Sequence, residues 1–146
     1  MRNPGHGGIS LIDNDVLRIK VRPGASGQAV LCFSGIGHKV GGVDIQGDEF
    51  ARATAGATTI FIADLQRSWG NNFDFADVVT LIEPYTRGRR LHALGNSMGG
   101  FLAILASRFL PLETVIAFCP QFSVNPAIIA ENRWANYVGA IKAWRY

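Results

Sequence analysis

Short, strongly apolar runs alternate along this chain with stretches whose apolar residues have helical spacing. Residues 29–33 are apolar without interruption, as in strands buried on both faces of a sheet. Further strands are predicted over 58–63, 91–94 and 114–118, and an alternating, half-exposed strand over 16–21. Helices are predicted between them, over 48–55, 75–85 and 98–110. Because such strands need crossover connections, we predict an α/β fold, a three-layer sandwich with a mostly parallel central sheet.

The length of 146 residues fits one domain, 1–146, with its sheet and helices within 15–120. In the remaining stretch, 121–146, large apolar residues fall at helical spacing: Trp134, Tyr137, Val138, Ile141 and Trp144. This stripe predicts a helical tail packed on the sheet, or else the beginning of a cap over a site.

The composition argues against several classes of partner. The net charge is only +3 and the basic residues are scattered, so no nucleic-acid partner is expected. The start, MRNPGHGG, lacks the apolar core of a secretory signal. The longest strongly apolar stretch, 101–106, is too short to cross a bilayer. We therefore expect a cytoplasmic protein with no membrane partner.

The two cysteines, Cys32 and Cys119, each lie within an apolar run. Neither has a CxxC partner or a nearby histidine, so no metal site is expected. Buried free thiols in a reducing compartment explain them better than a disulfide does.

The most informative segment is Gly95-Asn96-Ser97-Met98-Gly99, which stands between a predicted strand and an almost wholly apolar helix. The pattern G-x-S-x-G in this context is typical of a sharp bend that exposes the serine oxygen above a sheet. Such a bend points the next backbone N–H, that of Met98, at the place where an oxyanion would form. The alternative is a glycine-rich turn in which Ser97 serves as an ordinary helix N-cap.

On this segment and on the order of its strands, the chain resembles the α/β-hydrolase superfamily over roughly residues 15–120. The resemblance implies a serine hydrolase that acts on an ester, thioester or amide through Ser97. It implies a small-molecule acyl substrate and no cofactor. It also implies that the strand 29–33 lies beside the strand before Ser97.

The loop after that strand, Ser34-Gly35-Ile36-Gly37-His38, would supply a second donor to the oxyanion. The resemblance assigns this role to the backbone N–H of Ile36, with Ser34, Gly35 and His38 beside the substrate pocket. The family often has His-Gly where this chain has Ser34-Gly35, so the match is imperfect. The alternative is a flexible connection.

A second loop is expected at the same edge of the sheet, because it follows the strand 58–63. Asp64 ends that strand, and Arg67 and Trp69 follow it. These three side chains are candidates to line a substrate pocket, with Trp69 stacking on a sugar or acyl group. Alternatively the loop holds itself together, with Asp64 paired to Arg67 and Trp69 half-buried.

A reactive serine needs a base and an orienting acid, and in this family both follow the serine in the chain. After Ser97 the sequence has no histidine and no aspartate, and its acids there are Glu113 and Glu131. Three explanations stay open. The chain is shortened at the C-terminus relative to a longer enzyme, it is a catalytically inactive relative, or it recruits an upstream base.

His38 is the best upstream candidate for that base, since its loop should lie at the edge where Ser97 lies. His92 belongs to the strand before Ser97 and is expected to be a packed core residue. His6 belongs to the N-terminal segment.

The alternative function is a catalytically inactive, hydrolase-like module for binding or interaction. The predicted strand 114–118 would form an apolar sheet edge, and exposed edges of this kind pair with other chains. Self-association through that edge is therefore a candidate interaction.

Overall fold

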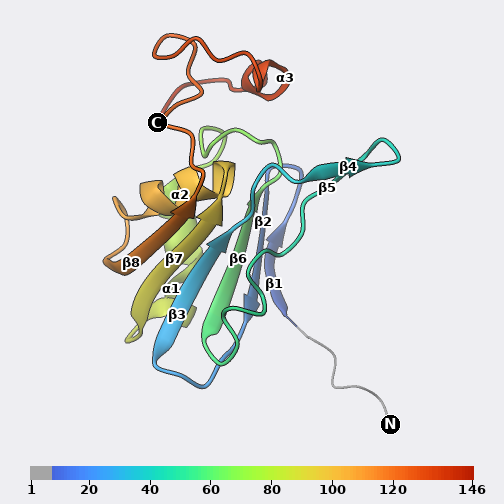
Figure 1. Cartoon of the computed structure of the whole chain (residues 1–146). Coiled ribbons are helices and arrows are strands. Elements are labelled where there is room, and N and C mark those ends of the chain that lie inside the picture. Colours follow the sequence, from blue (N-terminus) through green and yellow to red (C-terminus); the bar gives the residue numbers. More distant parts are fainter. Residues whose placement is uncertain (1–7) are drawn as a thin grey trace.

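The computed structural model describes residues 8–146. Its centre is a six-stranded sheet with two helices packed on it, and a separate two-stranded hairpin projects from one end (Figure 1). From one edge to the other, the sheet consists of β1 (Ile9–Asp13), β2 (Leu17–Arg22), β6 (Thr58–Asp64), β3 (Gln28–Phe33), β7 (Arg90–Asn96) and β8 (Leu112–Phe118). The hairpin is β4 (His38–Val40) with β5 (Val43–Ile45), and the helices are α1 (Phe75–Thr86), α2 (Met98–Ala106) and α3 (Ala135–Val138).

The four strands β6, β3, β7 and β8 are parallel to one another, whereas β1 and β2 add an antiparallel edge. The predicted α/β class with a mostly parallel central sheet is confirmed. The strands β3 and β7 are neighbours, with Phe33 paired to Gly95 at their carboxyl ends. The loops after these two strands therefore begin side by side.

Helices α1 and α2 pack on the same face of the sheet. Alternate residues of β3, Leu31 and Phe33, share a buried core with Phe75 of α1 and Leu102 of α2. Burying a side chain of this size stabilises the fold by about 1.5–3 kcal/mol. Ring contacts extend this core, since Phe75 stacks on Phe109 with their centroids 5.0 Å apart.

The opposite face has no helical layer among residues 8–146, so the expectation of three layers is not met there. Val30, Cys32 and Phe61 form a smaller cluster on this face, covered by Phe50 and its neighbours. The helix predicted over 48–55 is absent because Phe50 has a φ of 62°, which a right-handed helix does not allow. A series of turns covers the sheet instead.

Other elements also differ from their predicted bounds. Strand β1 is partly exposed at an antiparallel edge and carries no continuous apolar run, so the sequence pattern missed it. The hairpin β4–β5 is exposed and was missed for the same reason. Helix α2 ends at Ala106 rather than at residue 110. Directly after this end, the Ser107 hydroxyl donates a hydrogen bond to the Ile104 carbonyl at 2.7 Å.

The tail forms only the four-residue helix α3, not the longer helix that its apolar stripe predicted. Three members of the stripe, Trp134, Tyr137 and Val138, pack against the main core, whereas Trp144 is 38% exposed. The end of the tail is held by hydrogen bonds between its backbone and a side chain of the loop after β6. Asn71 Oδ1 accepts from the N–H groups of Arg145 and Tyr146, at 2.6 and 3.1 Å.

Strand β8 is the outermost strand on its side of the described sheet. Ile116 and Phe118 on this strand are 44% and 49% exposed. Self-association through this edge remains a prediction. As for membranes, no helix within residues 8–146 combines the length and the apolar character needed to cross one.

The two cysteines lie in different environments, and thiol reagents should distinguish them. Cys32 is fully buried, and burial raises the pKa of its thiol to about 12, whereas Cys119 is exposed. Both cysteines are free thiols, as predicted, but the predicted burial is wrong for Cys119, which follows the end of β8. We expect a maleimide to modify Cys119 in the native protein, and Cys32 only after unfolding in urea. Peptide mass spectrometry identifies the labelled residue, and labelling of native Cys32 would contradict this burial.

Candidate functional site

Ser97 occupies a strained bend between β7 and α2. Its φ and ψ are 54° and −120°, a conformation that residues with a side chain rarely adopt. The bend is held by the Ser97 N–H, which donates to the Phe118 carbonyl at the end of β8 at 2.8 Å. The Ser97 side chain makes no hydrogen bond to the start of α2, so the alternative of an ordinary N-cap is wrong.

The two glycines beside Ser97 are required by close backbone contacts. A Cβ atom at Gly95 would lie 1.9 Å from the Gly99 carbonyl oxygen. A Cβ atom at Gly99 would lie 2.1 Å from the carbonyl oxygen of Phe33, in β3. The bend therefore packs directly on the neighbouring strand, as the spacing of the glycines predicts.

A cavity of about 370 Å³ opens at Ser97. The residues that line it come from the bend, from the segment after β8 and from the tail: Ser97, Cys119, Pro120, Gln121, Phe122, Ser123, Ile129, Glu131 and Arg133. Hydrogen bonds from Arg133 lower the pKa of the Glu131 carboxyl to about 2, so this carboxylate is ionised and is a weak base. The Ser97 hydroxyl and the polar rim formed by Glu131 and Arg133 thus belong to the same cavity.

Gln121 is the side chain that contacts the Ser97 hydroxyl. Its amide nitrogen donates to Ser97 Oγ at 3.0 Å, and its amide oxygen accepts from the indole N–H of Trp69 at 3.2 Å. Gln121 was not among the residues predicted from the sequence. Its position in the sequence could have indicated this contact. Gln121 lies three residues after the end of β8, which is parallel to β7, and the carboxyl ends of parallel strands share one edge of a sheet.

The loop after β6 holds itself together rather than lining the cavity at Ser97. Asp64 is fully buried and its Oδ2 accepts from the N–H and hydroxyl of Ser68 and from the N–H of Gly70, at 2.9–3.0 Å. Arg67, the partner expected for Asp64, instead donates from Nε to the Ile36 carbonyl at 3.2 Å. Trp69 is fully buried, not half-buried, so no face of its ring is open for a substrate to stack on.

The loop after β3 lies against the bend. A Cβ atom at Gly35 would be 3.0 Å from the Asn96 carbonyl oxygen and 3.8 Å from Ser97 Cβ. The Gly35 N–H is bonded to Glu49 Oε1 at 2.9 Å, and the hydroxyl of buried Ser34 donates to the Gly47 carbonyl at 2.7 Å. This loop is therefore anchored by side chains and is not a loose connection.

The described histidines do not line the cavity at Ser97. His38, the base that we expected to be nearest, lies in the exposed hairpin strand β4. His6 lies outside the described residues. His92 is half-buried on β7, and among residues 8–146 its Nε2 atom has no hydrogen-bond partner.

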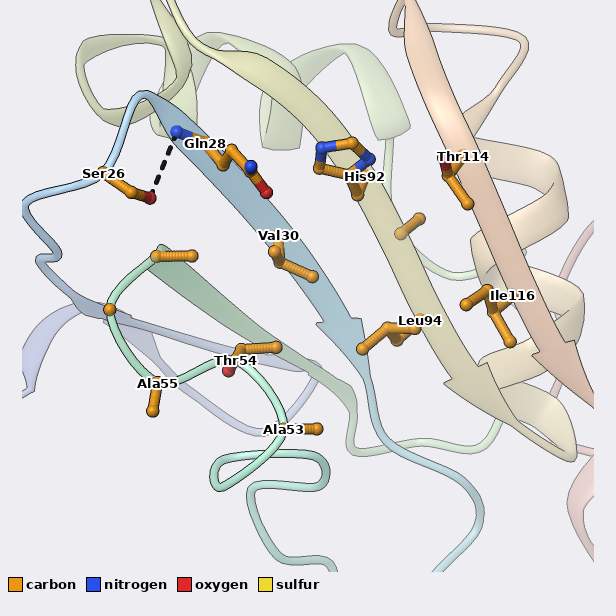
Figure 2. Close-up of a pocket in the computed structure, with 13 residues that line it drawn as sticks. Ser26, Gln28, Val30, Ala53, Thr54, Ala55, His92, Leu94, Thr114 and Ile116 are labelled. Atoms are coloured by element: carbon orange, nitrogen blue, oxygen red, sulfur yellow. Dashed lines mark hydrogen bonds between the residues drawn. The ribbon is translucent and has the colours of Figure 1, made fainter.

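His92 lines a second cavity, of about 410 Å³, on the sheet face opposite to α1 and α2 (Figure 2). Apolar side chains of three adjacent strands, Val30, Leu94 and Ile116, form part of its wall, with Gln28 and Thr114 on either side of His92. Ser97 does not line this second cavity. The histidine expected in the core thus faces a different site.

Asp64 should make the stability of the fold depend on pH. Burial is the main cause that raises the pKa of its carboxyl, against hydrogen bonds from Gly70 and Ser68 that lower it. The folded state then holds the proton more tightly than the unfolded state, so this contribution to stability falls as pH rises from the unfolded carboxyl pKa to the folded one. Asp64→Asn keeps an acceptor oxygen and removes the charge, and should reduce that fall.

The measurement is urea denaturation of both proteins over a pH series that begins below pH ~4, the ordinary pKa of an aspartate. Glu49 also has a raised pKa, caused first by burial, and is unchanged in the variant, so it cancels in the difference. Equal slopes of unfolding free energy against pH in the two proteins would contradict this account of Asp64.

No protein-family model and no curated protein matches the chain. Similar solved structures are found, and three of them are of the capsule O-acetyltransferase of Neisseria meningitidis serogroup A. One is of that enzyme, and the others are a complex with caged gadolinium and a histidine-to-alanine variant in complex with CoA. Sequence identities are 15–17% and TM-scores 0.63–0.65.

The match covers 86–97% of this chain but only 58–67% of the neighbours' chains. At this identity the likeness establishes a shared fold.

The assignment to the α/β-hydrolase superfamily is corrected by this comparison. The neighbours are acetyltransferases, so the predicted serine hydrolase function is wrong. The bend at Ser97 and the backbone N–H groups of Met98 and Ile36 therefore do not mark this chain as a hydrolase. The neighbours do not favour an inactive binding module either. The reason for the error is physical: a G-x-S-x-G pattern specifies how tightly a backbone bends, but not whether water or another molecule receives an acyl group.

Proposed function

We propose that this chain carries the acyl-transfer site of an O-acyltransferase, which moves an acyl group from a small-molecule carrier to a hydroxyl group. The observation that supports this most is the strained Ser97 at the mouth of a cavity, in a fold shared with O-acetyltransferases. Strain of this kind costs about 1–3 kcal/mol, persists only where the surrounding structure enforces it, and is concentrated at functional sites.

In the proposed reaction, Ser97 Oγ attacks the carbonyl carbon of an acyl thioester. A C–O bond forms, the C–S bond breaks, and by the end of the step the thiolate has taken the serine proton. A hydroxyl oxygen of the acceptor then attacks the serine ester, Ser97 leaves, and the acceptor's proton returns to it. The sum is one acyl group exchanged for one proton between donor and acceptor.

Two backbone groups are proposed to hold the carbonyl oxygen while it carries negative charge. Met98 follows Ser97 as the first residue of α2, and its N–H lies at the positive end of that helix. Ile36 belongs to the loop that packs against the bend. In comparable sites, each donor that is already in position before the reaction raises kcat roughly 10²–10³-fold.

The donor is proposed to be an acyl thioester of the CoA type, because one neighbour is in complex with CoA. A groove of about 620 Å³ adjoins the cavity at Ser97, and both are lined by Pro120, Gln121 and Phe122. Ile104 and Phe122 give the groove apolar walls, against which the hydrocarbon parts of such a carrier's arm can pack, and Arg108 offers a cation for a phosphate. The residues present therefore fit the group.

The acceptor is proposed to bind at the polar rim of the cavity. Glu131 and Arg133 lie there. The guanidinium of Arg133 is exposed and the carboxylate of Glu131 is partly buried, and both groups can bond to hydroxyl groups. A hydroxyl held at this rim would compete with water for the serine ester. That competition distinguishes transfer from hydrolysis.

The test follows acetyl-CoA that carries a radioactive acetyl group, mixed with the protein and a panel of mono- and oligosaccharides. We expect labelled acetyl esters of an acceptor, and thiol release that speeds up when the acceptor is added. Label found only as free acetate, at the rate seen in buffer alone, would overturn the proposal.

A further inference from the structure

Gln121 joins the Ser97 hydroxyl to a buried part of the fold. Its amide nitrogen is 3.0 Å from Ser97 Oγ, and its amide oxygen is 3.2 Å from the indole nitrogen of Trp69. These three residues come from the ends of three strands: Ser97 follows β7, Gln121 follows β8, and Trp69 lies in the loop after β6.

The indole determines which end of the amide faces Ser97. An indole N–H can only donate, so it requires the amide oxygen, and the amide nitrogen must then point at the hydroxyl. A free glutamine could turn its amide around, since both orientations occupy the same space. Here Trp69 prevents the exchange, because it is fully buried.

Trp69 is itself held by the loop. Its backbone has a φ of 51°, between Ser68 and Gly70, both of which donate to the buried Asp64 carboxyl. Its ring packs against the ring of Trp134 in the tail, with the two ring centroids 6.1 Å apart. The donor that orients Gln121 is therefore a rigid one.

We propose that Gln121 is a catalytic residue at Ser97, oriented by Trp69 as a positioning residue; this rests on the proposed acyl transfer. A serine hydroxyl has one proton and two lone pairs. Because Gln121 occupies one lone pair by donating to it, the proton points elsewhere and the other lone pair is directed away from the amide. When Ser97 leaves the ester as an alkoxide, the same N–H bond becomes charge-assisted and stronger.

The first experiment compares acyl transfer by wild-type protein, Gln121→Ala and Gln121→Glu. Loss of the donor should lower kcat roughly 10²-fold in Gln121→Ala, with a smaller change in KM. In Gln121→Glu, an ionised carboxylate cannot donate to Ser97, but a protonated one can. Relative to wild type at each pH, this variant should therefore regain activity as pH falls, a response that a purely structural role would not produce.

Gln28→Ala is the matched control, because Gln28 lines the cavity on the opposite sheet face. It should retain wild-type kcat. A Gln121→Glu protein that is most active when its carboxylate is ionised would overturn the inference, because the side chain would then act as a base rather than as a donor.

The second experiment tests the contacts without any activity. In a two-dimensional ¹H–¹⁵N spectrum, Gln121→Ala should move the indole resonance of Trp69, and Ser97→Ala should move the side-chain amide resonances of Gln121. Trp69→Phe, which removes the indole donor, should also shift those amide resonances.

The two experiments separate the possible failures. An indole resonance that Gln121→Ala leaves unchanged would overturn the contact, whatever the activity. If the resonances respond as expected but wild-type protein transfers no acyl group, the proposed function is overturned, and the catalytic role of Gln121 is overturned with it.

Discussion

Gly99→Ala should prevent the chain from folding, or destabilise it by about 4 kcal/mol or more, a large part of the free energy that holds a domain together. The added Cβ atom would lie 2.1 Å from the Phe33 carbonyl oxygen and 2.8 Å from that of Ser34. Both are backbone atoms of the central strand or its end, so neither can move without disturbing the sheet. Circular dichroism and urea denaturation measure the loss.

Gly27→Ala is the control for this substitution. A Cβ atom at Gly27 meets nothing within 4 Å, and its φ is not positive. Its stability should stay within about 1 kcal/mol of wild type, and on the favourable side if the unfolded chain becomes less flexible. Equal denaturation midpoints for Gly99→Ala and wild type would mean that the bend does not pack on β3 as described.

Ser97→Ala should abolish the acetylated form of the protein and reduce acyl transfer by roughly 10³-fold or more, because no other group would take up the acyl group in the proposed reaction. Intact-protein mass spectrometry after rapid acid quenching of a mixture with acetyl-CoA detects the intermediate. Ser10→Ala, an exposed serine on β1, should behave as wild type in both measurements.

Stability gives an independent check on the same residue. The left-handed φ of 54° at Ser97 favours glycine by about 1 kcal/mol or more over a residue with a Cβ atom. Ser97→Gly should therefore be more stable than Ser97→Ala, although both are inactive. An acetylated Ser97→Ala protein with wild-type turnover would show that the acyl group is carried elsewhere.

The parallel strands could be predicted from the sequence because strands buried on both faces, such as 29–33, leave a continuous apolar run. The exposed elements could not. Strand β1 and the hairpin at His38 carry no such run, and the helix predicted over 48–55 fails at one residue, Phe50, whose left-handed backbone no local pattern announces.

The candidate site divides in the same way. The bend at Ser97 is a local structure, and the glycines two residues before and after it record the contacts that it makes. The contact between Ser97 and Gln121 is not local. It joins residues 24 positions apart and depends on β8 lying beside β7, which the sequence alone does not specify.

The hydrogen bonds that Asn71 accepts from Arg145 and Tyr146 connect the tail to the candidate site. Asn71 holds the last residues of the chain, and two positions earlier in the same loop Trp69 holds the amide of Gln121. Residues 145–146 are thus connected to the Ser97 hydroxyl through Asn71, Trp69 and Gln121. We therefore expect that displacing residues 145–146 from Asn71 would weaken the contact between Gln121 and Ser97 Oγ.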